Sequence, residues 1–335
     1  MNIELIVFII YLICMLGIGV WFFVKTKNGG EKDYFLGGRQ MGPWVSALSA
    51  GASDMSAWVL MGLPASIYAA GIGQAWIAIG LAIGYAISWI LEAPRLRKFT
   101  IAANDSITLP QFLTNRFLSK SSAIRIICAV IFLIAFTVYV ASAFVAGTTV
   151  FQTLFGDAIS EKTAMIIYVL IIIGYTFLGG FLAESASDFM QAVVMILALV
   201  AILGLGIANA GGFAAVMENA KSYDGFFSLL RTSTPSETQV NAFGAGKTFG
   251  IMSILSALAW GLGYFGMPHI LVRFMAVKSE KEMKKSKGVA ITWVTISLIM
   301  AAVIGIVGRA YMDYSTITEV GTEKIFIEMI KKVFT

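Results

Sequence analysis

Long apolar runs constrain what this chain can fold into more than any other feature of its sequence. Eight of them recur along the 335 residues, at 3–24, 43–70, 72–93, 123–151, 163–180, 186–209, 248–275 and 289–310. An α-helix needs about 20 apolar residues to cross a bilayer. Because no water is available there to satisfy the backbone, runs of this length fold as helices. The sequence therefore predicts an all-α polytopic membrane protein.

The overall composition agrees with this class. Charged residues make up 13% of the chain and hydrophobic residues 58%, whereas a soluble domain has about 25% charged residues. The two cysteines, Cys14 and Cys128, fall inside apolar runs, so we interpret them as small buried residues rather than a disulfide. The first run has neither a basic leader nor a small-residue cleavage site, which favours a retained span over a signal peptide.

The distribution of Lys and Arg predicts an orientation in the membrane. Sixteen of the 24 basic residues lie in loops or span ends on one side of the predicted helices. The positive-inside rule assigns that side to the cytoplasm, so the N-terminus is predicted to lie outside. This distribution also accounts for the net charge of +5. We therefore expect the lipid bilayer, and no nucleic acid, as a partner.

The run from Trp44 to Gly71 makes a poor plain membrane helix. It is 28 residues long, and nine of the twelve residues from Ser46 to Ala57 are Ser, Ala or Gly, with Asp54 among them. A charged side chain deep in a bilayer costs at least ~2.5 kcal/mol, so it normally marks a site or an ion path. Small residues let a neighbouring backbone, a solute or an ion approach closely. We predict that this helix is broken near Asp54.

The predicted break offers oxygen ligands to a small cation. Carbonyls near Ala52 and Met55, together with the Ser56 hydroxyl, are hard donors of the kind that such a cation prefers. Unwound backbone is tolerated at membrane depth only where it is buried in protein or lines a cavity. Asp54 would supply negative charge close by. The alternative is that Asp54 pairs with a basic residue of another helix and only packs.

The run 248–275 contains a second predicted break. Three glycines and a proline fall within the eight residues from Gly261 to Pro268, and together they should interrupt a helix. Aromatic residues flank this break, which favours a wall for a small organic solute over a kinked packing helix. We interpret the single histidine, His269, as structural. Two interrupted spans that cross in opposite directions are typical of secondary transporters built from inverted repeats.

A polar cluster opens the sixth run. Gly179 and Gly180 end the fifth run, and the polar residues that follow are Glu184, Ser185, Ser187, Asp188 and Gln191. Two interpretations remain open: ordinary helix capping by Ser185 or Ser187, and a cation exit path. The sequence contains no metal-ligand spacing, nucleotide-binding loop or nucleophile arrangement, so an enzyme is the least expected class.

Four stretches carry a resemblance to a known family: DYFLGGRQMGPWVSALSAGASDMSAWVLMGLPASIYAAG, ITLPQFLTNRF, GGFLAESASDFMQ and LAWGLGYFGMPHILVRFMA. Through them the chain resembles the sodium:solute symporter family, and most closely its bacterial sodium/proline branch. The resemblance implies a leucine-transporter-like fold of two inverted five-helix repeats behind one extra N-terminal span. It also implies a location in the bacterial plasma (inner) membrane.

The resemblance implies roles for individual residues by motif position. The positions linked to sodium binding or release are Ala52, Asp54, Met55, Ser56 and Asp188. The positions that would line the proline pocket are Trp58, Tyr139, Trp260, Tyr264 and Pro268. Arg39 matches a polar position linked to coupling between sodium and solute.

The resemblance also implies more spans than the eight predicted here. We therefore expect a single transporter domain that is incomplete: residues 1–42 form the extra span and loop, 43–210 the first repeat, and 248–310 the truncated start of the second repeat. We expect that these 335 residues alone do not transport.

The function implied for such a symporter is sodium-coupled uptake of proline into the cell, with sodium as the coupling ion and no other cofactor. One alternative is symport of another small solute, such as a sugar, carboxylate or vitamin. The other is a membrane sensor or binding module that does not transport.

Overall fold

The computed structural model describes residues 3–26, 29–55, 58–155, 160–234, 243–312 and 321–334. Contacts between residues divide the chain into two compact units. The first unit comprises Met1–Asp54, Leu91–Gln191 and Pro268–Val289. The second unit comprises Met55–Ile90, Ala192–Met267 and Ala290–Thr335.

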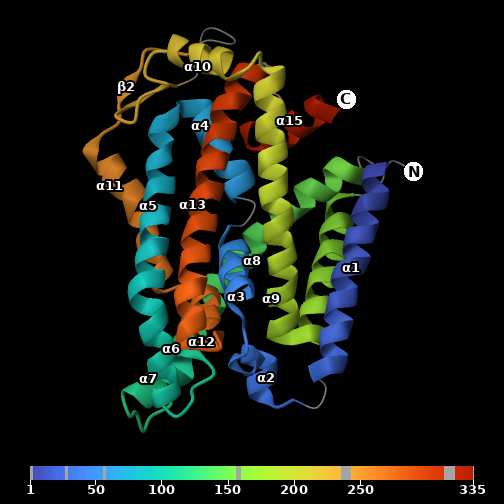
Figure 1. Cartoon of the computed structure of the whole chain (residues 1–335), viewed down its shortest axis with the longest axis vertical. Coiled ribbons are helices and arrows are strands. Elements are labelled where there is room, and N and C mark those ends of the chain that lie inside the picture. Colours follow the sequence, from blue (N-terminus) through green and yellow to red (C-terminus); the bar gives the residue numbers. More distant parts are fainter. Residues whose placement is uncertain are drawn as a thin grey trace. The chain divides into compact units, whose positions relative to one another are not determined.

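Both units consist mainly of helices (Figure 1). The first unit contains α1 (Ile3–Thr26), α2 (Glu31–Leu36), α3 (Pro43–Asp54), α6 (Ala93–Ala102), α7 (Leu109–Arg116), α8 (Ala123–Phe155) and α12 (Pro268–Ala276). The second contains α4 (Leu63–Ala70), α5 (Ala75–Ile87), α10 (Phe213–Ser222), α11 (Ile251–Ala259), α15 (Ile325–Phe334) and the strands β1 (Arg231–Thr232) and β2 (Lys247–Thr248). Two long helices, α9 (Glu161–Asn209) and α13 (Glu280–Tyr311), contribute residues to both units.

The described residues include helices that can cross a membrane. Five are long and apolar enough, and the broken pair formed by residues 251–265 and 268–276 makes six. Each of the eight predicted runs has a helical counterpart among the described residues, and runs 163–180 and 186–209 share α9. The chain is therefore a multi-pass membrane protein, as its sequence predicted.

The chain reverses its direction within α9. Its 49 residues would extend about 70 Å as one straight helix, far more than the ~30 Å hydrocarbon core. Gly180 interrupts it with φ 61° and ψ −159°, a conformation that glycine adopts without a steric penalty. Figure 1 shows the chain turning back at this end of the first unit.

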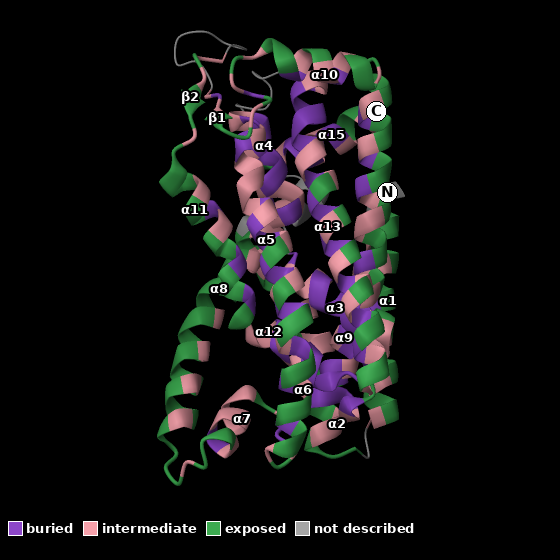
Figure 2. Cartoon of the chain, turned by 60° about the vertical axis from the view of Figure 1, so that its left-hand side comes forward, coloured by how far each residue is buried: buried purple, intermediate pink, exposed green. Residues whose placement is uncertain are grey.

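The core of the first unit lies where α3 packs against α12. Ala47 and Ala50 of α3 are fully buried, as are Phe274, Met275 and Ala276 of α12. Helix α6 also contacts α12. Figure 2 shows buried residues concentrated on these helices, whereas α8 is largely exposed and lipid would cover it in a membrane.

Helix α1 packs on the first limb of α9 (Figure 1). A Cβ atom added to Gly19 of α1 would lie 3.1 Å from Cβ of Tyr175, so the backbones approach closely at this point. The side-chain amide of Gln191 donates a hydrogen bond of 2.8 Å to the hydroxyl of Tyr11. The predicted extra N-terminal span is therefore docked against the polar segment of α9.

In the second unit, α5 packs against α11 through glycine. A Cβ atom on Gly84 would lie 2.1 Å from the carbonyl oxygen of Gly261, and one on Gly80 would lie 2.6 Å from Cα of Leu258. Small residues let membrane helices approach closely enough for backbone contact. The contact fixes α5 against the chain at the second predicted break.

The segment 210–247 joins α9 to α11. It contains α10 and β1, which pairs antiparallel with β2. The carboxylate of Asp224 accepts hydrogen bonds of 2.6 and 2.9 Å from both terminal nitrogens of Arg231. Backbone N–H of Ile72 donates to the carbonyl of Phe226 at 2.8 Å, which joins this region to the start of α5.

Both predicted breaks are present. Helix α3 ends at Asp54, and the chain continues after residues 56–57 as a π-helical turn, Trp58–Gly62. Helix α11 ends at Ala259, a 3₁₀ turn covers Trp260–Phe265, and α12 begins at Pro268. The small residues of the first run and the Gly–Pro cluster of the second therefore predicted the interruptions correctly.

We predict that Gly84→Ala destabilises the second unit, because the added methyl group would overlap the Gly261 carbonyl. Overpacking of this kind typically costs about 1–3 kcal/mol. The matched control is Gly17→Ala, a helical glycine with no atom within 4 Å of its added Cβ. Thermal unfolding in detergent should show a clear loss for Gly84→Ala and none for Gly17→Ala. Equal stability of the two variants would contradict the close contact.

Candidate functional site

Helix α3 ends at Asp54, inside the run 43–70 that the sequence predicts to span the membrane. The last four carbonyls of any helix have no partner within that helix. One of them, the Ser53 carbonyl, accepts a hydrogen bond of 3.1 Å from the hydroxyl of Tyr139 on α8. Ala52 and Asp54 lie in the same last turn. The first unit therefore joins three predicted site positions, Ala52, Asp54 and Tyr139, at one helix end.

Asp188 lies buried against α3. Its side-chain oxygen Oδ2 accepts hydrogen bonds from the hydroxyls of Ser49, at 2.8 Å, and Ser53, at 2.9 Å. Ser53 thus contacts Asp188 through its hydroxyl and Tyr139 through its carbonyl. Asp188 and the end of α3 belong to one polar cluster in the first unit.

The partner of Asp188 is an arginine that the sequence did not single out. Arg273 of α12 is 1% exposed, and its Nη2 lies 2.6 Å from Oδ2 of Asp188. Its Nε donates to the hydroxyl of Ser49 at 2.6 Å, and its Nη1 donates to the carbonyl of His269. Nη2 also lies 3.4 Å from Glu184, whose side chain is 41% exposed. All three guanidinium nitrogens are therefore satisfied.

A signal for Arg273 was present in the sequence. It interrupts the apolar stretch HILVRFMAV, and an ionisable residue inside a span is a functional candidate by default. Because it lies near the end of run 248–275, it also fits the positive-inside pattern of basic residues. For Asp54 we considered pairing with a basic residue of another helix. The structure contains a pair of this kind, but Arg273 forms it with Asp188.

The capping interpretation of Ser185 and Ser187 is wrong. Helix α9 continues through both residues, so neither lies at a helix start. The Ser185 hydroxyl instead lies 3.9 Å from the sulfur of Met41. The buried Ser187 hydroxyl has no hydrogen-bond partner among the described residues.

His269 packs between aromatic rings. Its imidazole stacks on Tyr139 with ring centroids 5.5 Å apart, and Phe136 meets it edge-on at 5.7 Å. Neither ring nitrogen has a hydrogen-bond partner within the part of the chain that the structure describes. His269 follows Pro268, which begins α12, so the ring stack holds that helix start against α8.

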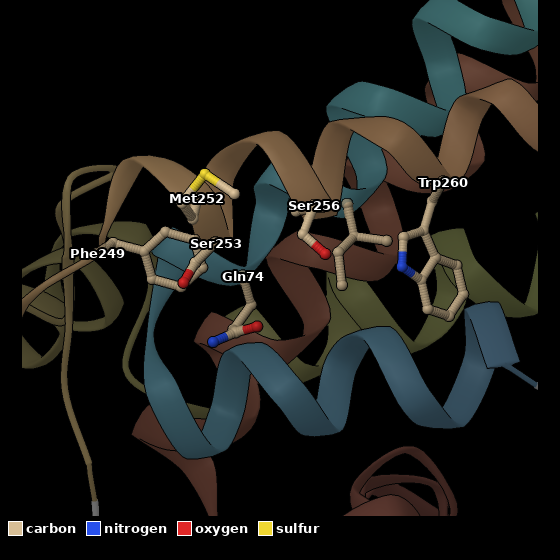
Figure 3. Close-up of a pocket in the computed structure, with 8 residues that line it drawn as sticks. Gln74, Phe249, Met252, Ser253, Ser256 and Trp260 are labelled. Carbon is tan, nitrogen blue, oxygen red and sulfur yellow. The ribbon is translucent and has the colours of Figure 1, made fainter.

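In the second unit, Trp58 and Trp260 lie face to face, with ring centroids 5.9 Å apart and ring planes 26° apart. Trp260 also lines an open cavity of about 530 Å³. Figure 3 shows Gln74, Ser253 and Ser256 on the same cavity, with the Trp260 indole at one end. The cavity combines aromatic, hydroxyl and amide surfaces.

Tyr264 does not line this cavity. It is 1% exposed, and its ring packs edge-on against Tyr85 of α5 with centroids 5.1 Å apart. Met55, beside the first break, is also buried in the second unit. Ser56 lies outside the described residues. Among the predicted site positions of the second unit, Trp260 lines the cavity and stacks on Trp58, whereas Tyr264 and Met55 are buried.

Arg39 lies in the first unit, in the loop after α2. It is 6% exposed, and its guanidinium donates to the carbonyls of Met275, at 2.6 Å, and Ser106, at 2.8 Å. Its Nε bonds Asp105 at 3.0 Å. Its backbone φ of 56° is unusual for a residue with a side chain. These contacts tie the loop after α2 to the C-terminal end of α12.

Two basic residues, Lys32 and Arg39, lower the pKa of Asp105, which lies outside the predicted spans. Partial burial opposes ionisation of Asp105, but hydrogen bonds and charges from Lys32 and Arg39 outweigh it and lower the pKa of that carboxyl. Asp105 is therefore ionised at neutral pH, and its pairing favours the folded state.

We predict a pH dependence from this carboxylate. Because its folded pKa is lowered, its stabilising contribution is present above the ordinary Asp pKa of about 3.9 and is lost as pH falls through the lowered value. Asp105→Asn should therefore lower the unfolding temperature at pH 7. The difference from the parent should shrink as the pH approaches about 3. A difference that stays constant across that range would refute the assignment.

We also predict that Arg273→Met strongly destabilises the first unit, because it leaves Asp188 buried without a cation. Breaking one side of a buried pair typically costs about 3–5 kcal/mol. The double variant Arg273→Met/Asp188→Asn should recover part of this loss, since no unpaired charge remains. Thermal unfolding in detergent measures all three proteins.

The control for this experiment is Lys331→Met, which removes an exposed lysine 2.8 Å from Glu328. Surface pairs contribute at most about 1 kcal/mol. An Arg273→Met loss no larger than that of Lys331→Met would contradict a buried, essential pair.

Interrupted spans with polar groups at the breaks are typical of secondary transporters. Residues 34–335 match the sodium:solute symporter family. The chain is 39% identical over 325 residues to the sodium/proline symporters of Staphylococcus aureus strains JH9 and NCTC 8325 / PS 47, which covers 97% of this chain and 60% of theirs. The chain therefore belongs to the sodium:solute symporter family.

A solved structure shares the fold. It is that of a Na⁺-coupled sialic acid symporter in a substrate-bound outward-open state, with a TM-score of 0.74 and 20% sequence identity. The match covers 98% of this chain and 65% of that chain. The leucine-transporter-like fold expected from the resemblance is thereby confirmed. The chain spans 60% of the length of the Staphylococcus relatives.

Proposed function

We propose that the chain belongs to a transporter that carries proline into the cell together with sodium. The observation that supports this most directly is the end of α3 at Asp54, inside a membrane span. A helix C-terminus carries partial negative charge, and its free carbonyls can coordinate a cation. The 39% identity to sodium/proline symporters supports both the ion and the solute.

The sodium ligands in this proposal come from the first break. Ala52 and Met55 contribute backbone carbonyls, and Ser56 contributes its hydroxyl. Asp54 balances the charge of the ion. Oxygen donors of this kind suit a hard cation, which makes sodium the coupling ion and leaves no need for another cofactor.

In this proposal, the aromatic residues at the two breaks bind the solute. A pyrrolidine ring is apolar, and the exposed face of Trp260 offers a matching surface. Trp58, Tyr139 and Pro268 would line the same pocket at another stage of transport. Tyr264 would have to leave its contact with Tyr85 to take part, so we assign it to a different conformation from the one described.

Sodium release in this proposal passes Asp188. Arg273 holds that carboxylate at 2.6 Å, so a sodium ion arriving from the end of α3 must compete with a guanidinium. Displacement of Arg273 would move α12, because the arginine lies within this nine-residue helix. The end of α12 is held by Arg39, which makes Arg39 a coupling residue.

The membrane arrangement is part of the proposal. The N-terminus lies outside the bacterial inner membrane, following the positive-inside rule. Residues 1–42 form an extra span and loop before the first repeat, 43–210, and 248–310 begin the second repeat. Alternating access then arises from movement of one repeat against the other around the bound solute.

The test is uptake of labelled proline by proteoliposomes that contain the full-length gene product, with and without an inward sodium gradient. Accumulation only with the gradient supports the proposal, and competition by unlabelled proline but not by a sugar or a carboxylate fixes the solute. Sodium-stimulated uptake of another solute would replace proline in the proposal. Binding of solute with no uptake under any gradient would favour a sensor or binding module.

Within this function, Asp54→Asn should weaken sodium dependence, because it removes the charge that balances the ion while keeping the size of the side chain. We expect the sodium concentration for half-maximal proline uptake to rise by about tenfold or more, equivalent to at least ~1.4 kcal/mol of lost sodium affinity. Asp224→Asn, which changes a half-exposed carboxylate outside the spans that pairs with Arg231, is the control and should leave this concentration unchanged. Unchanged sodium activation in Asp54→Asn would remove Asp54 from the site.

A further inference from the structure

A pocket of about 430 Å³ lies in the first unit between α6 and the start of α13. Arg95 and Lys98 of α6 line it, and Lys284 and Lys287 of α13 line it from the other side. Each pair has the i, i+3 spacing that places two side chains on the same face of a helix. The two helices therefore present basic faces to one space.

The charge of this basic pocket is not neutralised by the protein. None of these four side chains has an ion-pair partner among the residues that the structure describes. Glu280 is the acid in the lining. A fifth basic residue, Arg97, also lines the pocket. The pocket thus carries an excess of positive charge that an anion would balance.

Apolar surface accompanies this charge. Phe99 and Met283 line the pocket together with the basic residues. Phe99 is 38% exposed, and two further apolar residues of this segment are also exposed, Leu91 at 45% and Ile101 at 41%. The guanidinium carbon of Arg116 lies 4.7 Å from the Phe99 ring centre, which adds positive charge at its edge. A ligand that matches the pocket has an anionic head and an apolar tail.

The position of the pocket agrees with that chemistry. It lies at the end of the first unit where basic residues are concentrated, which the positive-inside rule assigns to the cytoplasmic face. Basic pockets between membrane helices on that face bind anionic headgroups of lipids. The exposed apolar residues of α6 would face the acyl chains of the same leaflet.

We propose that this pocket binds an anionic phospholipid of the cytoplasmic leaflet. The lipid phosphate lies between Lys98 on one side and Lys284 and Lys287 on the other, and an acyl chain runs along Phe99. The site is separate from the sodium and proline positions and does not depend on transport.

The test is titration of the purified 335-residue protein in detergent with dioleoylphosphatidylglycerol, followed by native mass spectrometry of the bound lipid. The triple variant Lys98→Gln/Lys284→Gln/Lys287→Gln should bind this lipid about tenfold more weakly, since each lysine near an anionic surface contributes to attraction. Dioleoylphosphatidylcholine should bind the parent protein about tenfold more weakly than the anionic lipid.

The matched control is Lys120→Gln/Lys281→Gln/Lys285→Gln, which removes the same charge from exposed lysines of the same unit that do not line the pocket. It should bind the anionic lipid within about twofold of the parent. Equal losses in the two triple variants would show a general charge effect and overturn the site. Equal binding of both lipids would also overturn it.

A third arm separates lipid from free anion. Inorganic phosphate should not raise the unfolding temperature of the parent, whereas the anionic lipid should raise it and the pocket variant should lose that rise. Equal stabilisation by inorganic phosphate would mean that the pocket takes a small anion, and the lipid assignment would fall.

Discussion

The packing of the first unit depends on the ion pair that neutralises the buried guanidinium of Arg273. Arg273 is almost fully buried, and its nitrogens contact Asp188, Ser49, Glu184 and the carbonyl of His269. A buried ion pair contributes little net stability, because desolvation offsets most of the attraction. What it does provide is a unique arrangement, since any shift of α12 would leave a charge unpaired. The pair therefore fixes α12 against α3 and the Asp188 segment of α9.

Helix α12 connects this pair to the loop after α2. Pro268 begins the helix, and Arg273 lies at its centre. At its end the Met275 carbonyl accepts from Arg39, and the Ala276 carbonyl accepts from the backbone N–H of Met41 at 3.2 Å. A helix of nine residues moves as a rigid rod, so its two ends cannot respond independently. A change in what neutralises Asp188 would therefore reach the Arg39 loop through α12.

The sequence predicted the spans and both breaks because these follow from local chemistry: apolar length, small residues around Asp54, and glycine with proline before α12. It did not predict the Arg273–Asp188 pair, because a basic residue near a span end has the same local pattern as a topology signal. Nor did it predict that Gly84 touches Gly261 or that Tyr264 is buried, since both depend on which helices meet. Tertiary contacts, rather than helix formation, limited what could be predicted about the site.

The basic pocket and the C-terminal end of α12 share a residue, so a lipid bound in the pocket would act on the helix that carries Arg273. Arg97 lines the pocket, and its guanidinium also donates to the carbonyls of Val277, at 2.6 Å, and Lys278, at 2.7 Å. An anionic lipid held by Lys98 would compete with those carbonyls for the same guanidinium. Because carbonyls are neutral and a phosphate is charged, the phosphate makes the stronger hydrogen bond. Lipid charge would then alter how firmly the C-terminal end of α12 is held, on the same helix that carries Arg273.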